Sequence, residues 1–303
     1  MRCENKTKNL LLHICVFLLM IGKMASAQSI RLDAHMTKKS YLEGEPVVVI
    51  LSLSNIGQKE LAVAEPLVLE GFVSISIKNT EGKPVDAPRL VWDVALPPQD
   101  YGIEISPGQS LQQTWSINES YYFGLNPGSY RVLSIYDTSK HEGVYSRIWH
   151  GRLTGPELTF EVKAPTAMEE NAYSLLKKGR DILLKAQRMR YAESRKSLLD
   201  LVTRHPKSVY AAYAYYLLGK SYFVKQDDKT QHFAEAAEKF QDFLEKFPNY
   251  PYYSDMVRVS KLSFCLVKTG RTALAQEILQ KVPDGYYKQR MVRVIEKKGI
   301  GEQ

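Results

Sequence analysis

The hydrophobic and polar positions of this chain change their period near residue 165. Before that point, apolar and polar side chains alternate in short runs, most cleanly at residues 73–78 and 157–162, and turns rich in glycine and proline separate the runs. From about residue 168 onward, apolar residues instead recur every three to four positions. This pattern predicts a multidomain β plus α chain, in which an antiparallel β-sandwich is followed by an all-α array.

The same periodicities give the expected elements and domains. Strands are predicted at residues 30–36, 47–54, 73–78, 89–94, 109–117, 129–136 and 157–162. Helices are predicted at residues 168–186, 190–204, 208–224, 231–246, 252–268, 271–281 and 285–298. We therefore expect a sandwich domain at 28–163, a linker at 164–168 and a helical domain at 169–299, with the two domains folding separately.

A repeat is visible within the helical half. Residues 198–206 and 240–248 place apolar side chains at the same offsets before a proline, and these two prolines lie 42 residues apart. A weaker copy ends at Pro283, which lies 35 residues further on. Self-similarity at a fixed period indicates helical hairpins that stack side by side and leave a concave face open to a partner.

The middle repeat has a fixed succession of large and small residues, namely Leu218, Gly219, Tyr222, Ala236, Phe240, Phe243 and Pro248. This succession resembles the tetratricopeptide repeat family, which implies paired helices brought close by the small residues and separated by aromatic ones. Long repeats that end in Phe-Pro-Asn, as at residues 247–249, are similar to those of periplasmic envelope-assembly and cell-division coordinator proteins. That likeness implies protein binding in the bacterial envelope.

Candidate binding residues follow from the resemblance, because the first helix of each pair lines the concave face. Gly219 is taken as the small position between helices, and Gly179 as its equivalent in the first repeat. Tyrosine and basic side chains suit peptide recognition, and the alternative is that the tyrosines pack between repeats or against the sandwich. The residues placed towards the groove are Tyr213, Tyr216, Lys220, Phe223, Arg180 and Tyr173.

Turn segments of the N-terminal half, at residues 41–47, 107–110 and 125–132, resemble those of exported bacterial immunoglobulin-like domains. In the third segment, Tyr130 is similar to a corner tyrosine whose hydroxyl ties a strand to the adjoining loop. More loosely, this half resembles the small β-sandwiches of a bacterial proteinase-inhibitor class. The resemblance leaves a second function open, in which the sandwich is the ligand-binding or inhibitor module and the repeats are its mount. Trp149, in a loop-like stretch, is the best candidate for an exposed aromatic ring.

Residues 1–27 have the pattern of an export signal. A basic start precedes an apolar run at residues 10–21 and the small-residue sequence Ala-Ser-Ala at 25–27. The run is short for a bilayer, which takes about 20 residues to span, although a membrane anchor is the alternative. We expect cleavage before Gln28 and a periplasmic or secreted mature chain without a transmembrane segment.

Charge is divided between the two halves. Residues 28–165 hold 12 Lys and Arg against 16 Asp and Glu, whereas residues 166–303 hold 25 against 16. The excess of positive charge in the helical half favours an acidic partner, although solvated helix faces account for much of it. Nucleic acid is not expected as the partner of an exported chain.

The chain has no recognisable catalytic or metal-binding motif. Neither G-x-S-x-G nor H-E-x-x-H occurs, and the segment 219–221 lacks the glycine that a phosphate loop needs at Ala214. Cys265, the cysteine left after signal cleavage, lies in an apolar helical stretch that favours an inert thiol. We therefore expect a non-enzymatic scaffold or adaptor, without cofactor or metal, that binds a protein or peptide through the concave face of its repeats.

Overall fold

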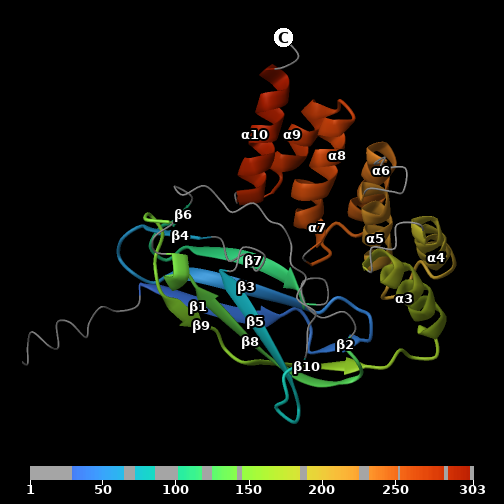
Figure 1. Ribbon diagram of the computed structural model, residues 1–303, viewed down its shortest axis with the longest axis horizontal. Coiled ribbons are helices and arrows are strands. Elements are labelled where there is room, and N and C mark those ends of the chain that lie inside the picture. The colour runs from blue at the N-terminus through green and yellow to red at the C-terminus, as the bar shows by residue number, and fades with distance from the viewer. Residues whose placement is uncertain are drawn as a thin grey trace, which may run out of the picture.

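The computed structural model describes residues 29–64, 72–85, 102–117, 125–141, 145–184, 190–224, 232–251, 253–282 and 286–300. Strands make up the N-terminal half and helices the C-terminal half (Figure 1). The change from strand to helix falls between β10 (Leu158–Lys163) and α3 (Glu170–Leu184), where the period of the sequence changes. The predicted export signal at 1–27 and the predicted strand at 89–94 lie outside the described residues.

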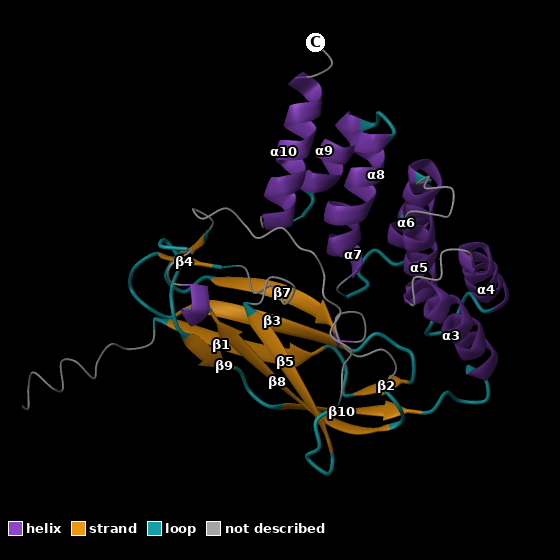
Figure 2. Cartoon of the chain, viewed as in Figure 1, coloured by secondary structure: helices purple, strands orange, loops and turns teal. Residues whose placement is uncertain are grey.

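The described strands form two larger sheets and a two-stranded one (Figure 2). Besides β10, they are β1 Ile30–Met36, β2 Ser40–Leu42, β3 Val48–Asn55, β4 Leu61–Val63, β5 Val73–Asn79, β6 Ile103–Ile105, β7 Ser110–Ser116, β8 Gly128–Asp137 and β9 Arg152–Thr154. One larger sheet has the order β1-β3-β7, and the other has the order β2-β10-β8-β5 with β9 beside β8. The strand pairs of both sheets are antiparallel apart from β10 and β2, which run parallel.

One hydrophobic core holds the two larger sheets together. Buried side chains of both sheets, such as Leu51 of β3 and Val132 of β8, belong to a single cluster. Burying a side chain of this size stabilises the fold by about 1.5–3 kcal/mol. Trp115 lies in this core, whereas Trp149 stacks on Tyr136 with ring centroids 6.1 Å apart. The Trp149 ring is therefore packed and does not form a free aromatic platform.

The hydroxyl of Tyr130 ties the start of β8 to the loop before it. It donates to the carbonyl oxygen of Asn126 at 2.7 Å, and the ring stacks on Phe160 of neighbouring β10 with centroids 5.3 Å apart. The hydrogen bond predicted for Tyr130 is thus confirmed, and it fixes the corner at which the chain enters the sheet.

The helices follow one another along an arc beside the β half (Figure 1). After α3 come α4 Tyr191–Arg204, α5 Ala211–Phe223, α6 Phe233–Lys246, α7 Tyr253–Met256, the π-helix η3 Val257–Leu262, α8 Ser263–Lys268, α9 Thr272–Gln280 and α10 Tyr286–Ile300. Each predicted helix is confirmed to within a few residues. The difference lies in the predicted helix at 252–268, which a π-helical stretch divides into α7 and α8.

Small residues let paired helices approach closely. A Cβ added to Gly219 in α5 would lie 2.4 Å from Cδ1 of Phe240 in α6. A Cβ added to Gly179 in α3 would lie 2.6 Å from Cγ of Leu198 in α4. Since no side chain fits at such distances, both glycines occupy the small position between helices that the sequence predicts for them.

The two halves of the molecule touch through tyrosine hydroxyls. Tyr173 of α3 donates to the Glu43 carboxylate at 2.6 Å, and Tyr210, just before α5, donates to the Glu43 carbonyl oxygen at 2.9 Å. Tyr253 of α7 donates to Oγ of Ser116, at the end of β7, at 3.2 Å. The N-terminal end of the first helix of each pair therefore contacts the β half. That the two halves also fold separately stays a prediction.

Candidate functional site

The face of α5 predicted to line a groove is divided along its length. Its N-terminal part is buried, since Tyr213 is 1% exposed and Tyr216 is 2% exposed. Its C-terminal part, Lys220 and Phe223, is half-buried and reaches the surface. The structure thus corrects the prediction of an open groove at Tyr213 and Tyr216, which pack in the core.

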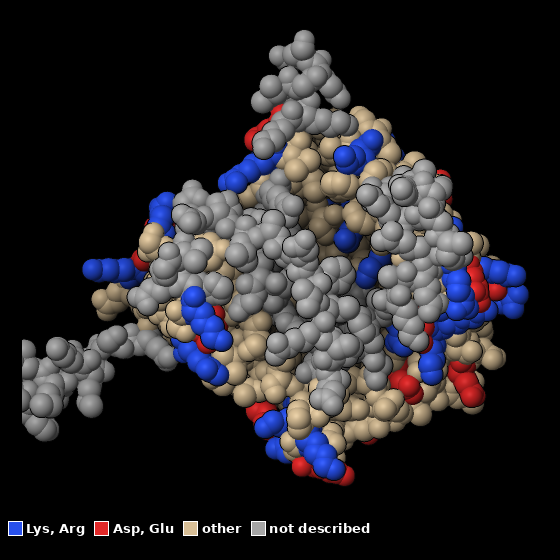
Figure 3. All heavy atoms as spheres, viewed as in Figure 1, with Lys and Arg blue, Asp and Glu red and all other residues tan. Residues whose placement is uncertain are grey.

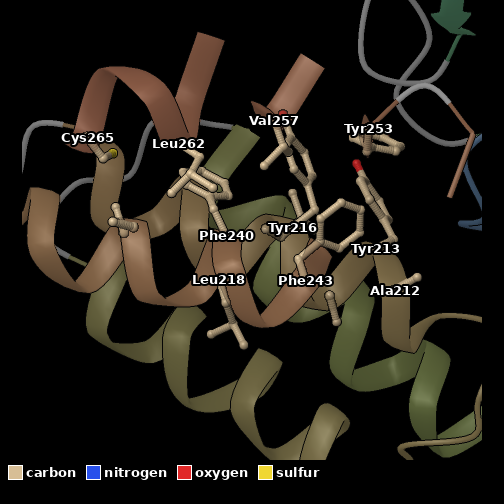
Figure 4. Close-up of a cluster of buried hydrophobic side chains, with 14 of the residues drawn as sticks. Ala212, Tyr213, Tyr216, Leu218, Phe240, Phe243, Tyr253, Val257, Leu262 and Cys265 are labelled. Carbon is tan, nitrogen blue, oxygen red and sulfur yellow. The ribbon is translucent and has the colours of Figure 1, made fainter. Parts of the chain in front are cut away.

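Tyr253 of α7 closes the N-terminal part of this face (Figure 4). Its ring centroid lies 4.4 Å from that of Tyr216 and 5.5 Å from that of Tyr213. Aromatic rings of α6 pack against Tyr216 as well. Because the Tyr253 hydroxyl also bonds Ser116, this tyrosine is fixed between the helices and the β half.

The two residues predicted from the first repeat lie in α3. Arg180 is buried, and its guanidinium nitrogen lies 3.2 Å from the Asp181 carboxylate. Tyr173 is half-buried, and burial, followed by its hydrogen bond to Glu43, raises the pKa of this residue above the ordinary 10.0. The Tyr173 hydroxyl therefore keeps its proton and donates it in the hydrogen bond to the Glu43 carboxylate. Tyr173 thus stabilises the junction of the halves, Arg180 is buried, and neither lines an open groove.

Phe223 is joined at the surface by residues of neighbouring helices, while Nζ of Lys220 lies 5.9 Å from the ring centroid of Tyr216 in the same helix. The rings of Phe223, Phe233 in α6 and Phe264 in α8 contact one another, with centroid distances of 5.6, 5.8 and 6.1 Å. Lys261 in η3 lies over Phe223, with its Nζ 4.5 Å from the ring centroid. The side chains of the two lysines and the three phenylalanines are half-buried. We call Lys220, Phe223, Lys261 and Phe264 the Lys–Phe surface.

The π-helix η3 positions one side of the Lys–Phe surface. The backbone N–H of Ser263 donates to the carbonyl oxygen of Arg258, five residues earlier, whereas an α-helix uses the fourth. The Ser263 hydroxyl donates to the same oxygen at 2.5 Å. The wider turn changes the direction of the side chains that follow Tyr253. Tyr253 therefore stays in the core while Lys261 lies over the ring of α5.

Lys261 and Phe264 are absent from the residues predicted from the sequence, although a signal for them was present. Lys220-x-x-Phe223 recurs as Lys261-x-x-Phe264 after 41 residues, close to the 42-residue spacing of the first two prolines. In each case the two residues lie three positions apart, on one face of a helix. The shorter distance from Pro248 to Pro283 obscures this register, because α9, the second helix of the third pair, has 9 residues whereas α6 has 14.

The helical segments that carry the Lys–Phe surface contain no acidic residue. Residues 211–223 and 257–268 hold basic side chains, among them Lys220, Lys261 and Lys268, and no Asp or Glu. Helix α6, in contrast, carries both signs of charge. Figure 3 shows a hollow beside α7, in which the charged side chains that can be seen are basic.

The described residues contain no arrangement typical of a catalytic or metal centre. No group of three or more of their His, Cys, Asp and Glu side chains is placed to hold a metal ion. Cys265 is buried, and burial raises the pKa of its thiol to about 12, which keeps the thiol protonated. Within the same part of the chain, no helix has the length and apolar character needed to cross a membrane.

Part of the helical half matches a known protein family. The family model of the tetratricopeptide repeat matches residues 213–250, which hold most of α5 and all of α6. The middle helical pair is thus similar to a tetratricopeptide repeat. No curated protein matches the chain.

Two solved structures show weaker likeness. Spo0M, a sporulation control protein from Bacillus subtilis, has 12% identity and a TM-score of 0.26 over 49% of this chain and 55% of its own. The native conformation of E. coli alpha-2-macroglobulin has 11% identity and a TM-score of 0.25 over 89% of this chain and 22% of its own. The match thus spans about half of Spo0M and under a quarter of the macroglobulin. At these TM-scores neither likeness identifies the fold.

Proposed function

We propose that this chain is an exported, non-enzymatic scaffold that binds a protein or peptide through its helical repeats. The match of residues 213–250 to the tetratricopeptide repeat carries this proposal, since stacked helical pairs present a continuous surface to a partner. The concave face is closed at Tyr213 and Tyr216, so the binding surface is its half-exposed continuation, the Lys–Phe surface.

The proposal includes the finer architecture of both halves. Equivalent close approaches at Gly179 and Gly219 support a single tetratricopeptide-type array. The Tyr130 hydrogen bond and the core shared by two sheets support an immunoglobulin-like sandwich. In this arrangement the β half supports the N-terminal ends of the first helices and leaves their C-terminal ends available to a partner.

Photo-cross-linking of the full chain tests the binding function. Benzoylphenylalanine replaces Phe223 in one variant and Ser76, an exposed residue of β5, in a control variant. We expect envelope proteins to be captured from position 223 and not from position 76. Capture from position 76 alone would favour the second function, with the β half as the ligand module. Capture from neither position would contradict protein binding.

Export is tested separately by the N-terminus of the protein isolated from bacteria that express the full chain. The signal pattern of residues 1–27 supports a mature start at Gln28 in the periplasm or the medium. Peptide mass spectrometry is expected to find a terminus at Gln28. Recovery of the chain from the cytoplasm with residues 1–27 retained would contradict this part of the proposal.

A further inference from the structure

We infer that this chain forms a dimer in which the edge strand β1 pairs antiparallel with β1 of a second copy, around a two-fold axis at Leu32. The inference concerns the β half and does not depend on the function proposed for the repeats. Three features carry it: the position of β1 at the edge of its sheet, the direction of its backbone hydrogen-bonding groups, and the order of its charges.

Strand β1 has an edge that another strand can join. It ends the sheet order β1-β3-β7, so its outer side pairs with no other described strand. The opposite edge, β7, carries the Ser116 contact with α7, and Figure 1 shows β1 on the side of the sheet away from α7. Sheet edges are often closed off by a very short strand, a proline or a bulge. Strand β1 has seven residues, no proline and an unbroken register with β3.

The backbone groups of β1 alternate between β3 and the outer side. The N–H of Ile56 donates to the Ser29 carbonyl oxygen at 2.9 Å, and the N–H of Thr37 donates to the Val48 carbonyl oxygen at 3.2 Å. Hydrogen-bonded pairs alternate along an antiparallel ladder, so the odd-numbered residues of β1 bond β3 and the even-numbered ones direct N–H and C=O outwards. Two copies of β1 can therefore pair only with even-numbered residues opposite one another, which places the two-fold axis at a residue.

The charges of β1 lie on the solvent face. Ile30, Leu32 and Ala34 are buried in the core between the sheets. Arg31 and Asp33 point the other way and are joined by an ion pair of 2.7 Å, with side chains 60% and 47% exposed. An ion pair as exposed as this contributes little to the stability of the single chain. Both side chains can therefore turn towards a second copy at small cost.

The order of the charges selects one register. With the axis at Leu32, Arg31 of each copy lies opposite Asp33 of the other. An axis at Arg31 or at Asp33 would place like charges opposite each other, which is destabilising. An axis at Ala34 would give Asp33 only the imidazole of His35 as a partner. The Leu32 register forms the oppositely charged pair twice, at positions that do not exchange hydrogen bonds, where cross-strand side chains are closest.

The resulting assembly is closed. Pairing at β1 joins two three-stranded sheets into one sheet of six strands and leaves neither copy with a free β1 edge. It also places two helical arrays in one particle. A partner that has two binding segments would then gain avidity without any new contact.

Sedimentation velocity of the full chain over a range of concentrations tests the inference. We expect a reversible monomer–dimer equilibrium with a Kd of about 1–100 µM, because an interface of this size is small. Arg31→Asp and Asp33→Arg each place like charges opposite one another and should each weaken the dimer at least about tenfold. An equimolar mixture of the two variants should form a heterodimer, because both cross-strand pairs then again combine opposite charges.

A matched control is available on β10. Glu161 and Lys163 form an exposed ion pair of 3.3 Å and are two residues apart, as Arg31 and Asp33 are, but β10 lies between β2 and β8. Glu161→Arg should therefore change the Kd by less than about twofold. Ala34→Pro removes an outward N–H and spares the bonds to β3, so it should abolish the dimer. Circular dichroism checks folding, and the charge variants decide the matter if the proline variant is unfolded.

Several results would overturn the inference. One is a chain that stays monomeric at concentrations of about 200 µM, above the expected Kd. Another is a dimer that neither reversal weakens, or one that Glu161→Arg weakens as much as they do. A mixture of the two folded reversal variants that stays monomeric would contradict the axis at Leu32, as would a dimer that Asp33→Arg abolishes and Arg31→Asp leaves intact. None of these results would affect the proposed binding function, which cross-linking from position 223 decides.

Discussion

The two ends of helix α5 share one continuous face but differ in how deeply that face is buried. At the N-terminal end, Tyr213 and Tyr216 are covered by Tyr253, which in turn bonds Ser116 of the β half. At the C-terminal end, Lys220 and Phe223 are half-buried. Helical register therefore selects a face, while residues distant in the sequence decide which part of that face becomes core.

This division suits a scaffold. The covered end fixes the array to the β half, where burial of aromatic rings supplies stability. The open end keeps its rings and lysines accessible at a modest cost, since the remaining helices are held in place by the covered end. Substitutions at the covered end should therefore affect stability more than substitutions at the open end.

Tyr216→Ala is expected to cost about 3–5 kcal/mol of unfolding free energy, as deletion of a large buried ring does. Its ring packs against Tyr253, Phe240 and Phe243 and has no room to be replaced by solvent. Phe223→Ala, at the open end, should cost about 1–2 kcal/mol because its ring is half-buried already. Urea unfolding followed by helical circular dichroism measures both. Equal losses would remove the distinction between the ends.

The junction between the halves should depend on the Tyr173 hydroxyl. Tyr173→Phe removes the 2.6 Å hydrogen bond and Glu43→Gln weakens it, and their double-mutant cycle should give a coupling of about 1 kcal/mol. The cycle requires urea unfolding of the two single variants, the double variant and the original chain. A coupling near zero would show that this contact adds nothing to the junction.

The contribution of Tyr173 should depend on pH in the alkaline range. Burial, and then the bond to Glu43, raises the pKa of Tyr173 above 10.0, so the folded chain holds this proton more tightly than the unfolded chain. The stabilisation is complete below the unfolded pKa and is lost as the pH rises through the folded one. The stability difference between the original chain and Tyr173→Phe should stay constant up to about pH 10 and shrink as the pH rises further. A difference that widens would contradict this assignment.

Lys261→Ala should leave the unfolding free energy within about 0.5 kcal/mol of the original value, because a half-exposed cation over a ring contributes little to stability. Its effect is expected in the binding of a partner at the Lys–Phe surface. Thermal unfolding of this variant beside Lys246→Ala is the check. A large loss of stability confined to Lys261→Ala would make this lysine part of the structural framework.

Much of the fold was predictable because it follows from patterns of neighbouring residues in the sequence. Alternation located the long strands, and the 3.6-residue period with its small residues located the helices and the close approach at Gly219. The short strands β2, β4, β6 and β9 were missed, since three residues are too few to show alternation and pairing alone defines them.

The site was only half predictable, for a physical reason. Lys220 and Phe223 follow from the register of α5, but the cover over Tyr213 and Tyr216 comes from Tyr253, whose own position depends on a contact with β7. Periodicity carries no information about such long-range contacts. The sequence pattern does not predict the π-helix either, because its apolar residues also fit the spacing of an α-helix.

Hydroxyl-radical footprinting of the intact chain, read residue by residue by mass spectrometry, tests the division of α5 most directly. Tyrosine and phenylalanine rings both react when exposed, so the two ends of the helix are compared within one molecule. The structure predicts labelling at Phe223 and Phe264 and protection of Tyr213 and Tyr216 until the chain is unfolded. Labelling of Tyr213 and Tyr216 in the folded protein, with Phe223 protected, would contradict the account.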